Sequence, residues 1–341
     1  MKKRTFALIS MLLVVFLAAC GGNSNSSGNE GGGSGSGNYT IGVTYTTPET
    51  GATHIGLEKF KELVEEQTDG DVQIELYPNG QLYASEREAI EAAQSGNIEM
   101  TVAASAPVAG FDENFLALDL PFIFSDHDTA YEALDGELGQ TLLDGLTEIG
   151  LVGLAYGETG MRSITNNKHP IESPDDLQGL KIRTMENEVH IETFKEYGAN
   201  ASPFAFGELY SALQQNTYDG MENPINLIDQ MKFYEVQDYL TISNHAYTAT
   251  VAFMNQDFFE SMPKEYQDII KDAASESMDY QREVAQQQDE EGIEVIEEHM
   301  EINELTPEQK EIFIEAAEPI FDKYEEIIGT ELMELTRSYS K

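Results

Sequence analysis

The chain has 341 residues, of which 40% are hydrophobic and 24% are charged, values typical of a folded protein with room for two domains. Nineteen lysines and arginines stand against 62 aspartates and glutamates, so the formal net charge at pH 7 is −43. So acidic a surface repels phosphate backbones and anionic lipids, which argues against nucleic-acid binding, and it suits a salty or alkaline setting in which ions screen the self-repulsion.

The N-terminus has the parts of a secretory signal. A basic Lys-Lys-Arg start is followed by an apolar run over residues 6–17 and then by small residues before Cys20, the chain's one cysteine. The apolar run is about 12 residues long, whereas a membrane-spanning helix needs roughly 20. The tetrapeptide Leu-Ala-Ala-Cys resembles the bacterial lipobox, in which cleavage leaves the cysteine first and lipid-modified. We therefore predict a signal peptide over residues 1–19 and a lipid anchor at Cys20, on the outer face of the cell membrane.

Residues 20–38 are almost wholly Gly, Ser and Asn, a composition typical of a flexible tether. Folded structure is therefore expected to begin near Tyr39. From there, strand-like and helix-like patterns alternate as β, α, β, α, β over residues 39–45, 54–67, 71–77, 85–95 and 97–104. This alternation continues through the middle of the chain and predicts a mostly parallel sheet flanked by helices.

The C-terminal part has a different pattern. Residues from about 264 to 299 contain no proline and one glycine. They predict a single helix of some 36 residues, about 54 Å long at 1.5 Å per residue. So long a helix is expected to span more than one lobe of the fold.

Arg183 is the first candidate for a binding role. In the strand-like run over residues 180–185, alternation sends Leu180 and Ile182 to one face and Arg183 to the other. A guanidinium held at a strand end can grip a carboxylate through two parallel hydrogen bonds. The pattern alone favours a structural ion pair with one of the 62 acidic residues, or an exposed charge, over a ligand contact.

Five further residues are weaker candidates. Arg162 follows a glycine-rich stretch, and Asn223 precedes a proline in a turn-like segment, where an Asx-turn is the common explanation. Phe206 lies near a turn, while His245 and Tyr247 lie in a β-like run, and all three are also consistent with core packing.

Motifs of catalysis are missing from the sequence. There is no GxSxG, GxxxxGK[ST] or HExxH sequence, and the six histidines lack metal-ligand spacing. Carboxylate pairs are too frequent in this chain to indicate a glycosidase. We therefore expect no enzyme, no cofactor and no metal site, with a secreted hydrolase that uses paired carboxylates as the alternative.

Read together, these segments resemble the solute-binding proteins of tripartite ATP-independent periplasmic (TRAP) transporters, the DctP family. The resemblance covers nearly all of residues 39–339. Its blocks lie in order along the chain at residues 77–82, 94–96, 160–162, 173–177, 179–183, 198–200, 208–214 and 219–224.

The resemblance assigns roles to individual residues. It implies that Arg183 forms the main salt bridge to a ligand carboxylate and that Arg162 assists it. It also implies that Asn223 hydrogen-bonds the ligand and that Phe206 forms a wall of the pocket.

The resemblance places His245 and Tyr247 near the binding cleft. Sialic-acid-binding members have polar and charged groups where this chain has Ala104 and Pro107, which argues against a large sugar acid of that kind. A smaller acid such as a C4-dicarboxylate is expected, with a uronate or an aromatic acid as alternatives.

The implied fold is α/β, with two lobes of the class II periplasmic-binding-protein type and the long helix across both. We expect lobe I to hold residues 39–160 and 248–288, and lobe II residues 161–247 and 289–341. The implied function is delivery of a small organic acid to integral membrane subunits of the DctQ-like and DctM-like kinds. A binding protein of an ATP-driven (ABC-type) importer or of a sensor is the alternative.

Overall fold

The computed structural model describes residues 39–340. The predicted signal peptide, the tether and Cys20 lie outside these residues. Among the helices of the described part, none combines the length and the apolar character that a bilayer crossing requires.

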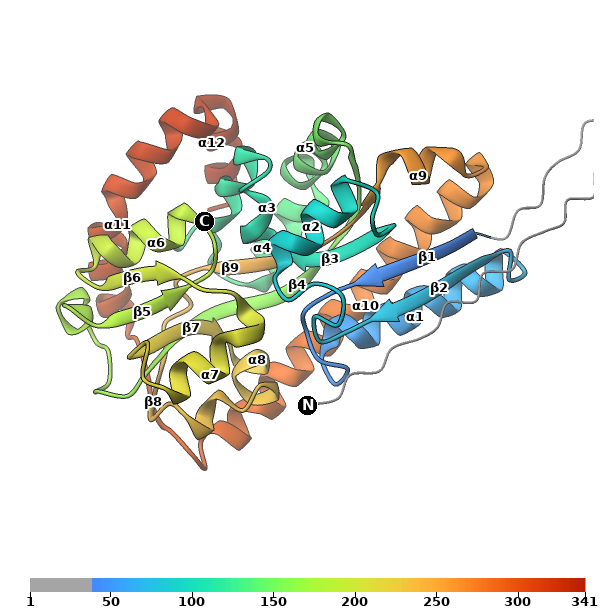
Figure 1. The fold of residues 1–341 in the computed structure, drawn as a ribbon. Helices are drawn as coiled ribbons and strands as arrows, with labels where there is room; N and C mark the ends of the chain where they lie inside the picture. The colour runs from blue at the N-terminus through green and yellow to red at the C-terminus, as the bar shows by residue number, and fades with distance from the viewer. Residues whose placement is uncertain (1–38, 341) are drawn as a thin grey trace, which may run out of the picture. The chain divides into compact units, whose positions relative to one another are not determined.

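Ten strands form a continuous sheet in the order β2-β1-β3-β9-β4-β7-β5-β6, and β8 pairs with both β4 and β10 (Figure 1). The strands are β1 (Tyr39–Thr44), β2 (Val72–Tyr77), β3 (Met100–Ala104), β4 (Leu151–Asn166), β5 (Lys181–Thr184), β6 (Asn200–Pro203), β7 (Gly220–Pro224), β8 (Tyr239–Ile242), β9 (Tyr247–Asn255) and β10 (Glu301–Glu304).

Helices cover the sheet on both faces, which confirms the predicted α/β class (Figure 1). They are α1 (Ala52–Gln67), α2 (Glu86–Gln94), α3 (Ser105–Val108), α4 (His127–Asp135), α5 (Glu137–Gly145), α6 (Glu188–Glu196), α7 (Leu209–Gln214), α8 (Ile225–Gln230), α9 (Gln256–Ser261), α10 (Lys264–Ile296), α11 (Pro307–Ile328) and α12 (Thr330–Ser338).

The prediction of a mostly parallel sheet is right for the outer strands and wrong for the centre. Strand β1 pairs in parallel with β2 and β3, and β5 pairs in parallel with β6 and β7. Strands β4 and β9 instead run antiparallel to each other and to their other neighbours. The physical reason is that β4 and β9 carry the chain from one part of the sheet to the other and back, so no crossover helix sets their direction.

Strand β4 joins two parts of the sheet. Its residues up to Met161 pair with β9, and its residues from Arg162 onward pair with β7. The register with β9 shifts between Glu158 and Gly160, and Gly160 has a φ of 127°, a conformation that a residue with a side chain rarely adopts. The strand therefore changes partners at an irregular point, directly before an arginine.

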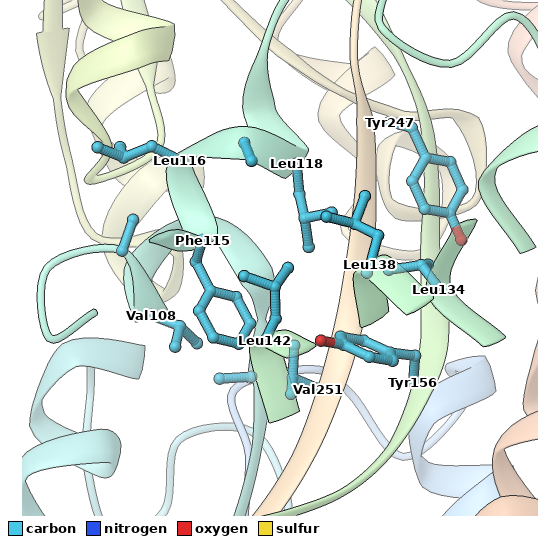
Figure 2. Packing of buried hydrophobic residues seen from close by; sticks show 14 of the residues in the cluster. Val108, Phe115, Leu116, Leu118, Leu134, Leu138, Leu142, Tyr156, Tyr247 and Val251 are labelled. Carbon is cyan, nitrogen blue, oxygen red and sulfur yellow. The ribbon is translucent and has the colours of Figure 1, made fainter. Parts of the chain in front are cut away.

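The long helix α10 has 33 residues, close to the predicted length, and would extend about 50 Å. Its N-terminal half packs through Ile270 and Met278 against a hydrophobic cluster that includes β1 and β3, and its last residue, Ile296, packs with β7 and β8. A further cluster lies around Phe115, Leu142 and Tyr156, whose side chains Figure 2 shows close together. The helix thus packs against both parts of the sheet.

Candidate binding cavity

A cavity lies where the carboxyl ends of β1, β3, β5 and β7 meet the middle of β4. Its space measures about 460 Å³, including the opening to solvent. Its lining comes from both parts of the sheet: Thr46, Thr47, Thr53, Glu86, Val102, Ala103, Ala104, Thr159, Arg162, Arg183, Met185, Phe206, Asn223, Leu227 and Thr250. Four of the six residues that the sequence singled out for binding are therefore together in one place.

Arg183 is a buried cation on this lining. On strand β5, the side chain of Ile182 packs in a hydrophobic cluster. The next residue, Arg183, lines the cavity, with 3% of its surface exposed. Its Nε and Nη2 donate to the carbonyl oxygen of Phe204 at 2.8 and 2.6 Å, which fixes the plane of the guanidinium. Its Nη1 is buried and has no hydrogen-bond partner among the described residues. Burial lowers the pKa of Arg183 to about 10, so the side chain stays charged at neutral pH.

Arg162 lines the same cavity but is fully paired. Its Nε forms an ion pair with Glu222, and its Nη2 donates to the backbone carbonyl of Glu222 at 2.6 Å. The same Nη2 donates to Asn223 Oδ1 at 3.1 Å, and Nη1 donates to Thr248 Oγ1 at 3.3 Å. Burial alone would raise the pKa of Glu222, but the charge of Arg162, the hydrogen bonds with His245 and Arg162 and the charge of His190 together hold that pKa well below its usual range.

Asn223 and Phe206 complete this wall. The Nδ2 of Asn223 donates to Met221 Sδ at 3.0 Å, and a thioether is a weak acceptor. The amide donor is therefore held in place without a strong partner. Phe206 packs edge-on against Phe233, with 6.3 Å between the ring centroids, so its orientation is set by the core beneath it.

His245 and Tyr247 lie behind the cavity and not on its lining. His245 hydrogen-bonds Ser243 through Nδ1 at 2.8 Å, and its Nε2 lies 3.7 Å from Glu222. Burial lowers the pKa of His245. The hydroxyl of Tyr247 donates to Glu158 at 3.4 Å. The ring of Tyr247 belongs to the hydrophobic cluster of Figure 2.

Glu86 is an acidic residue on the lining that was not predicted from the sequence. Its Oε1 accepts a hydrogen bond from the backbone N–H of Ala104 at 3.0 Å, and burial raises its pKa. Glu86 is the first residue of α2, directly after Ser85, whose side chain caps the helix. An acid at that position is typical of any helix start, so the pattern offered no sign of a cavity role.

A second acidic group lies outside the cavity lining. His127, Glu158 and Asp289 each bring one potential metal-ligand atom within 4.8 Å of the others. His127 Nδ1 already pairs with Glu158 Oε2 at 2.8 Å, and Asn226 N–H donates to Asp289 Oδ1 at 2.6 Å. Burial and the nearby charge of Glu158 raise the pKa of Asp289 to about 7.

Comparison with known proteins gives a consistent family. Residues 43–327 match the sequence pattern of the bacterial extracellular solute-binding proteins of family 7 (DctP). The C4-dicarboxylate-binding protein DctB of Bacillus subtilis is 34% identical over 281 residues, which cover 82% of this chain and 80% of that protein. The 2,3-diketo-L-gulonate-binding periplasmic protein YiaO of Escherichia coli is 37% identical over 70% of this chain and 72% of its own length.

Solved structures match over most of the chain. The sugar-acid-binding protein DctPAm of Advenella mimigardefordensis, in complex with galactonate, has a TM-score of 0.86 and 36% identity, covering 89% of this chain and 98% of that one. A TRAP periplasmic solute-binding protein of Sulfurospirillum deleyianum with bound succinate has a TM-score of 0.84 and 35% identity, covering 89% and 99%.

Proposed function

Because the chain belongs to the bacterial extracellular solute-binding proteins of family 7, we propose that it captures a small organic acid in the cavity and delivers it to the membrane subunits of a TRAP transporter. The fold is the two-lobed α/β fold of this family. Among its neighbours, one contains galactonate and another contains succinate at nearly equal identity, so similarity alone does not choose the ligand.

The observation that carries the proposal is the unpartnered Nη1 of Arg183. The guanidinium is buried, charged and fixed in its plane by Phe204, yet one of its donors lacks a partner among the described residues. A carboxylate supplies both the missing acceptor and the missing negative charge. The other end of the guanidinium is occupied by the Phe204 carbonyl, so the ligand approaches the edge that carries Nη1.

The neighbouring residues have supporting roles in this proposal. Arg162 donates a hydrogen bond to the Oδ1 of Asn223 and so orients the amide. In this proposal the Nδ2 of Asn223 is available to donate to a ligand. Phe206 provides an apolar wall. His245 stabilises Glu222 from behind, and Tyr247 packs beyond the wall, so neither is assigned a direct ligand contact.

Closure of the two lobes over the ligand would exclude water and strengthen the ion pair with Arg183. We assign lobe I to residues 39–160 and 248–288, and lobe II to residues 161–247 and 289–341. Strand β4 passes from lobe I to lobe II at Gly160, and the unusual φ of this glycine suits a hinge.

The proposed partners are DctQ-like and DctM-like membrane subunits, and the proposed anchor is a lipid on Cys20. In this family context the protein acts outside the cytoplasm as a carrier, so we expect the ligand to be released unmodified. An ABC-type importer or a sensor would use the same capture step but a different membrane partner.

The test is a calorimetric and thermal-shift screen of the purified protein against dicarboxylates, monocarboxylates, uronates and aromatic acids. A ligand at 100 times its Kd stabilises the protein by about 2.7 kcal/mol. We expect one class of carboxylates to bind with one molecule per chain and to be recovered chemically unchanged. A folded protein that binds none of these acids, or that converts one of them to a product, would contradict the proposal.

A further inference from the structure

The cavity that presents Arg183 to an anion also contains a carboxyl group. Glu86 lies on the lining together with Arg183 and Arg162, and it is half-buried there. The hydrogen bond from the Ala104 N–H to Oε1 holds the group in position. Because Glu86 comes from α2 and Arg183 from β5, the acid and the cation are supplied by different parts of the chain.

Within the described part of the chain, the lining presents one cation without a paired carboxylate, Arg183, and not two. Arg162 is neutralised by Glu222, so Arg183 is the cation left on the described lining. Glu86 and the nearby Glu186 both act on Arg183 electrostatically. A second carboxylate would therefore enter a site without a second free cation and would face Glu86.

The remaining polar groups suit hydroxyls. A ligand hydroxyl can donate to the Glu86 carboxylate and accept from a threonine hydroxyl at once. Five threonines line the cavity: Thr46, Thr47, Thr53, Thr159 and Thr250. The Oγ1 of Thr47 is buried without a hydrogen-bond partner among the described residues, so it is a polar group for which a ligand could supply the partner.

We propose that the ligand is a hydroxylated monocarboxylate of the aldonate kind, whose carboxylate binds Arg183 and whose hydroxyl donates to Glu86. This inference rests on the proposed capture of an acid by Arg183 and narrows its ligand class. It differs from the expectation of a C4-dicarboxylate, which was made from the sequence without Glu86. Glu86 is in this view the residue that discriminates between hydroxy acids and dicarboxylates.

The test compares erythronate with succinate, two four-carbon acids that differ in bearing hydroxyls or a second carboxylate. Galactonate serves as a longer hydroxy acid. In calorimetric titrations of the purified protein at neutral pH, at least one of the two hydroxy acids should bind at least tenfold more tightly than succinate. Tighter binding of succinate than of both hydroxy acids would overturn the inference while leaving the proposed function intact. Absence of binding by all three, and by the wider acid panel, would overturn both.

The variant Glu86→Gln keeps the acceptor for the Ala104 N–H and removes the charge. It should weaken hydroxy-acid binding about tenfold and strengthen succinate binding, so the ratio of the two Kd values shifts toward the dicarboxylate. The control is Glu88→Gln, the same change on an exposed residue of the same helix, which should leave both Kd values unchanged. An unchanged ratio in folded Glu86→Gln would overturn the role of Glu86, and if this variant does not fold, the wild-type comparison still decides the ligand class.

Discussion

Two buried arginines meet at the cavity, and they are held in opposite ways. Arg162 has a carboxylate, a carbonyl, an amide oxygen and a hydroxyl as partners, so its charge and its donors are used within the protein. Arg183 has a single backbone carbonyl as its hydrogen-bond partner, and its Nη1 is left over. In the proposed site, the first arginine belongs to the wall and the second offers its positive charge to the ligand.

The same contrast separates two acidic groups. Glu222 lies beside Arg162, which lowers its pKa, while Asp289 lies beside Glu158, which together with burial raises its pKa to about 7. Burial is therefore tolerated through pairing at one place and through protonation at the other. The comparison shows that the neighbours of a buried carboxyl group decide whether its pKa is lowered or raised.

The largest expected effect on stability comes from breaking the ion pair between Arg162 and Glu222. Glu222→Gln leaves Arg162 buried without its countercharge, which should lower the free energy of unfolding by about 3–5 kcal/mol. Urea denaturation measures this loss. The matched control is Glu325→Gln, which removes an exposed pair with Arg337 and should cost about 1 kcal/mol or less. A loss in Glu222→Gln as small as in the control would mean that the pair does not stabilise the wall.

The next largest effect is on ligand affinity and tests the role of Arg183. Arg183→Lys keeps the charge and loses the planar fork, so the affinity for the captured acid should fall by about 1.5–3 kcal/mol, or roughly 10- to 150-fold. Titration calorimetry gives the Kd, and the free energy of unfolding should change less than in Glu222→Gln. Arg337→Lys, at an exposed site, is the control. Wild-type affinity in Arg183→Lys would remove Arg183 from the site.

The two acidic groups should respond to pH in opposite directions. The pKa of Asp289 is raised in the folded state to about 7, so the folded protein binds the proton more tightly than the unfolded chain does. Its stabilising contribution is present below about pH 4 and is lost as the pH rises to about 7, with a slope of at most about 1.4 kcal/mol per pH unit. For Glu222, whose pKa is lowered, the contribution is present at neutral pH and is lost progressively as the pH falls below about 4.5, the ordinary pKa of a glutamate.

This difference can be measured as unfolding free energy against pH for the wild type and for Asp289→Asn. The variant should gain stability relative to the wild type as the pH rises between about 4 and 7, because Asn does not ionise. Parallel curves for the two proteins in this interval would show that Asp289 titrates normally in the folded state.

The smallest effect concerns Thr47. Thr47→Val removes a buried hydroxyl that has no partner among the described residues, so the unliganded protein should be equally stable or slightly more stable. Affinity for a hydroxy acid should fall by about 0.5–1.5 kcal/mol, the usual contribution of one hydrogen bond. Thermal unfolding and titration together separate the two effects. Equal affinity with a marked loss of stability would indicate a structural hydroxyl.

The α/β class, the long helix and the grouping of four residues around one cavity were predictable from the sequence; the four are Arg162, Arg183, Asn223 and Phe206. Strand alternation was sufficient to place Arg183 opposite Ile182, and the family resemblance supplied the other three. The positions of the remaining groups depend on tertiary packing. Periodicity does not record strand direction, so the antiparallel course of β4 and β9 was missed.

Glu86 and Tyr247 illustrate the same limit from two sides. Glu86 has the sequence features of an ordinary helix start, and its role arises because the end of β3 brings Ala104 to it. Tyr247 is close in sequence to cavity-lining Thr250, but the alternation along β9 and the packing of Phe124 place it in the core. The local sequence pattern predicts which face of a helix or strand a residue lies on. Which other element packs against that face depends on the tertiary fold.

The continuous helix α10 links the melting of the two parts of the sheet. Its N-terminal half shares a hydrophobic cluster with β1 and β3, and its C-terminal end shares another with β7 and β8. A helix loses stability when a large part of its apolar face is released, because its own hydrogen bonds add little without packing. Release of one end of α10 from its hydrophobic cluster therefore weakens the packing of the other end. We expect the described residues to unfold as one cooperative unit, although the cavity is lined by two parts of the sheet.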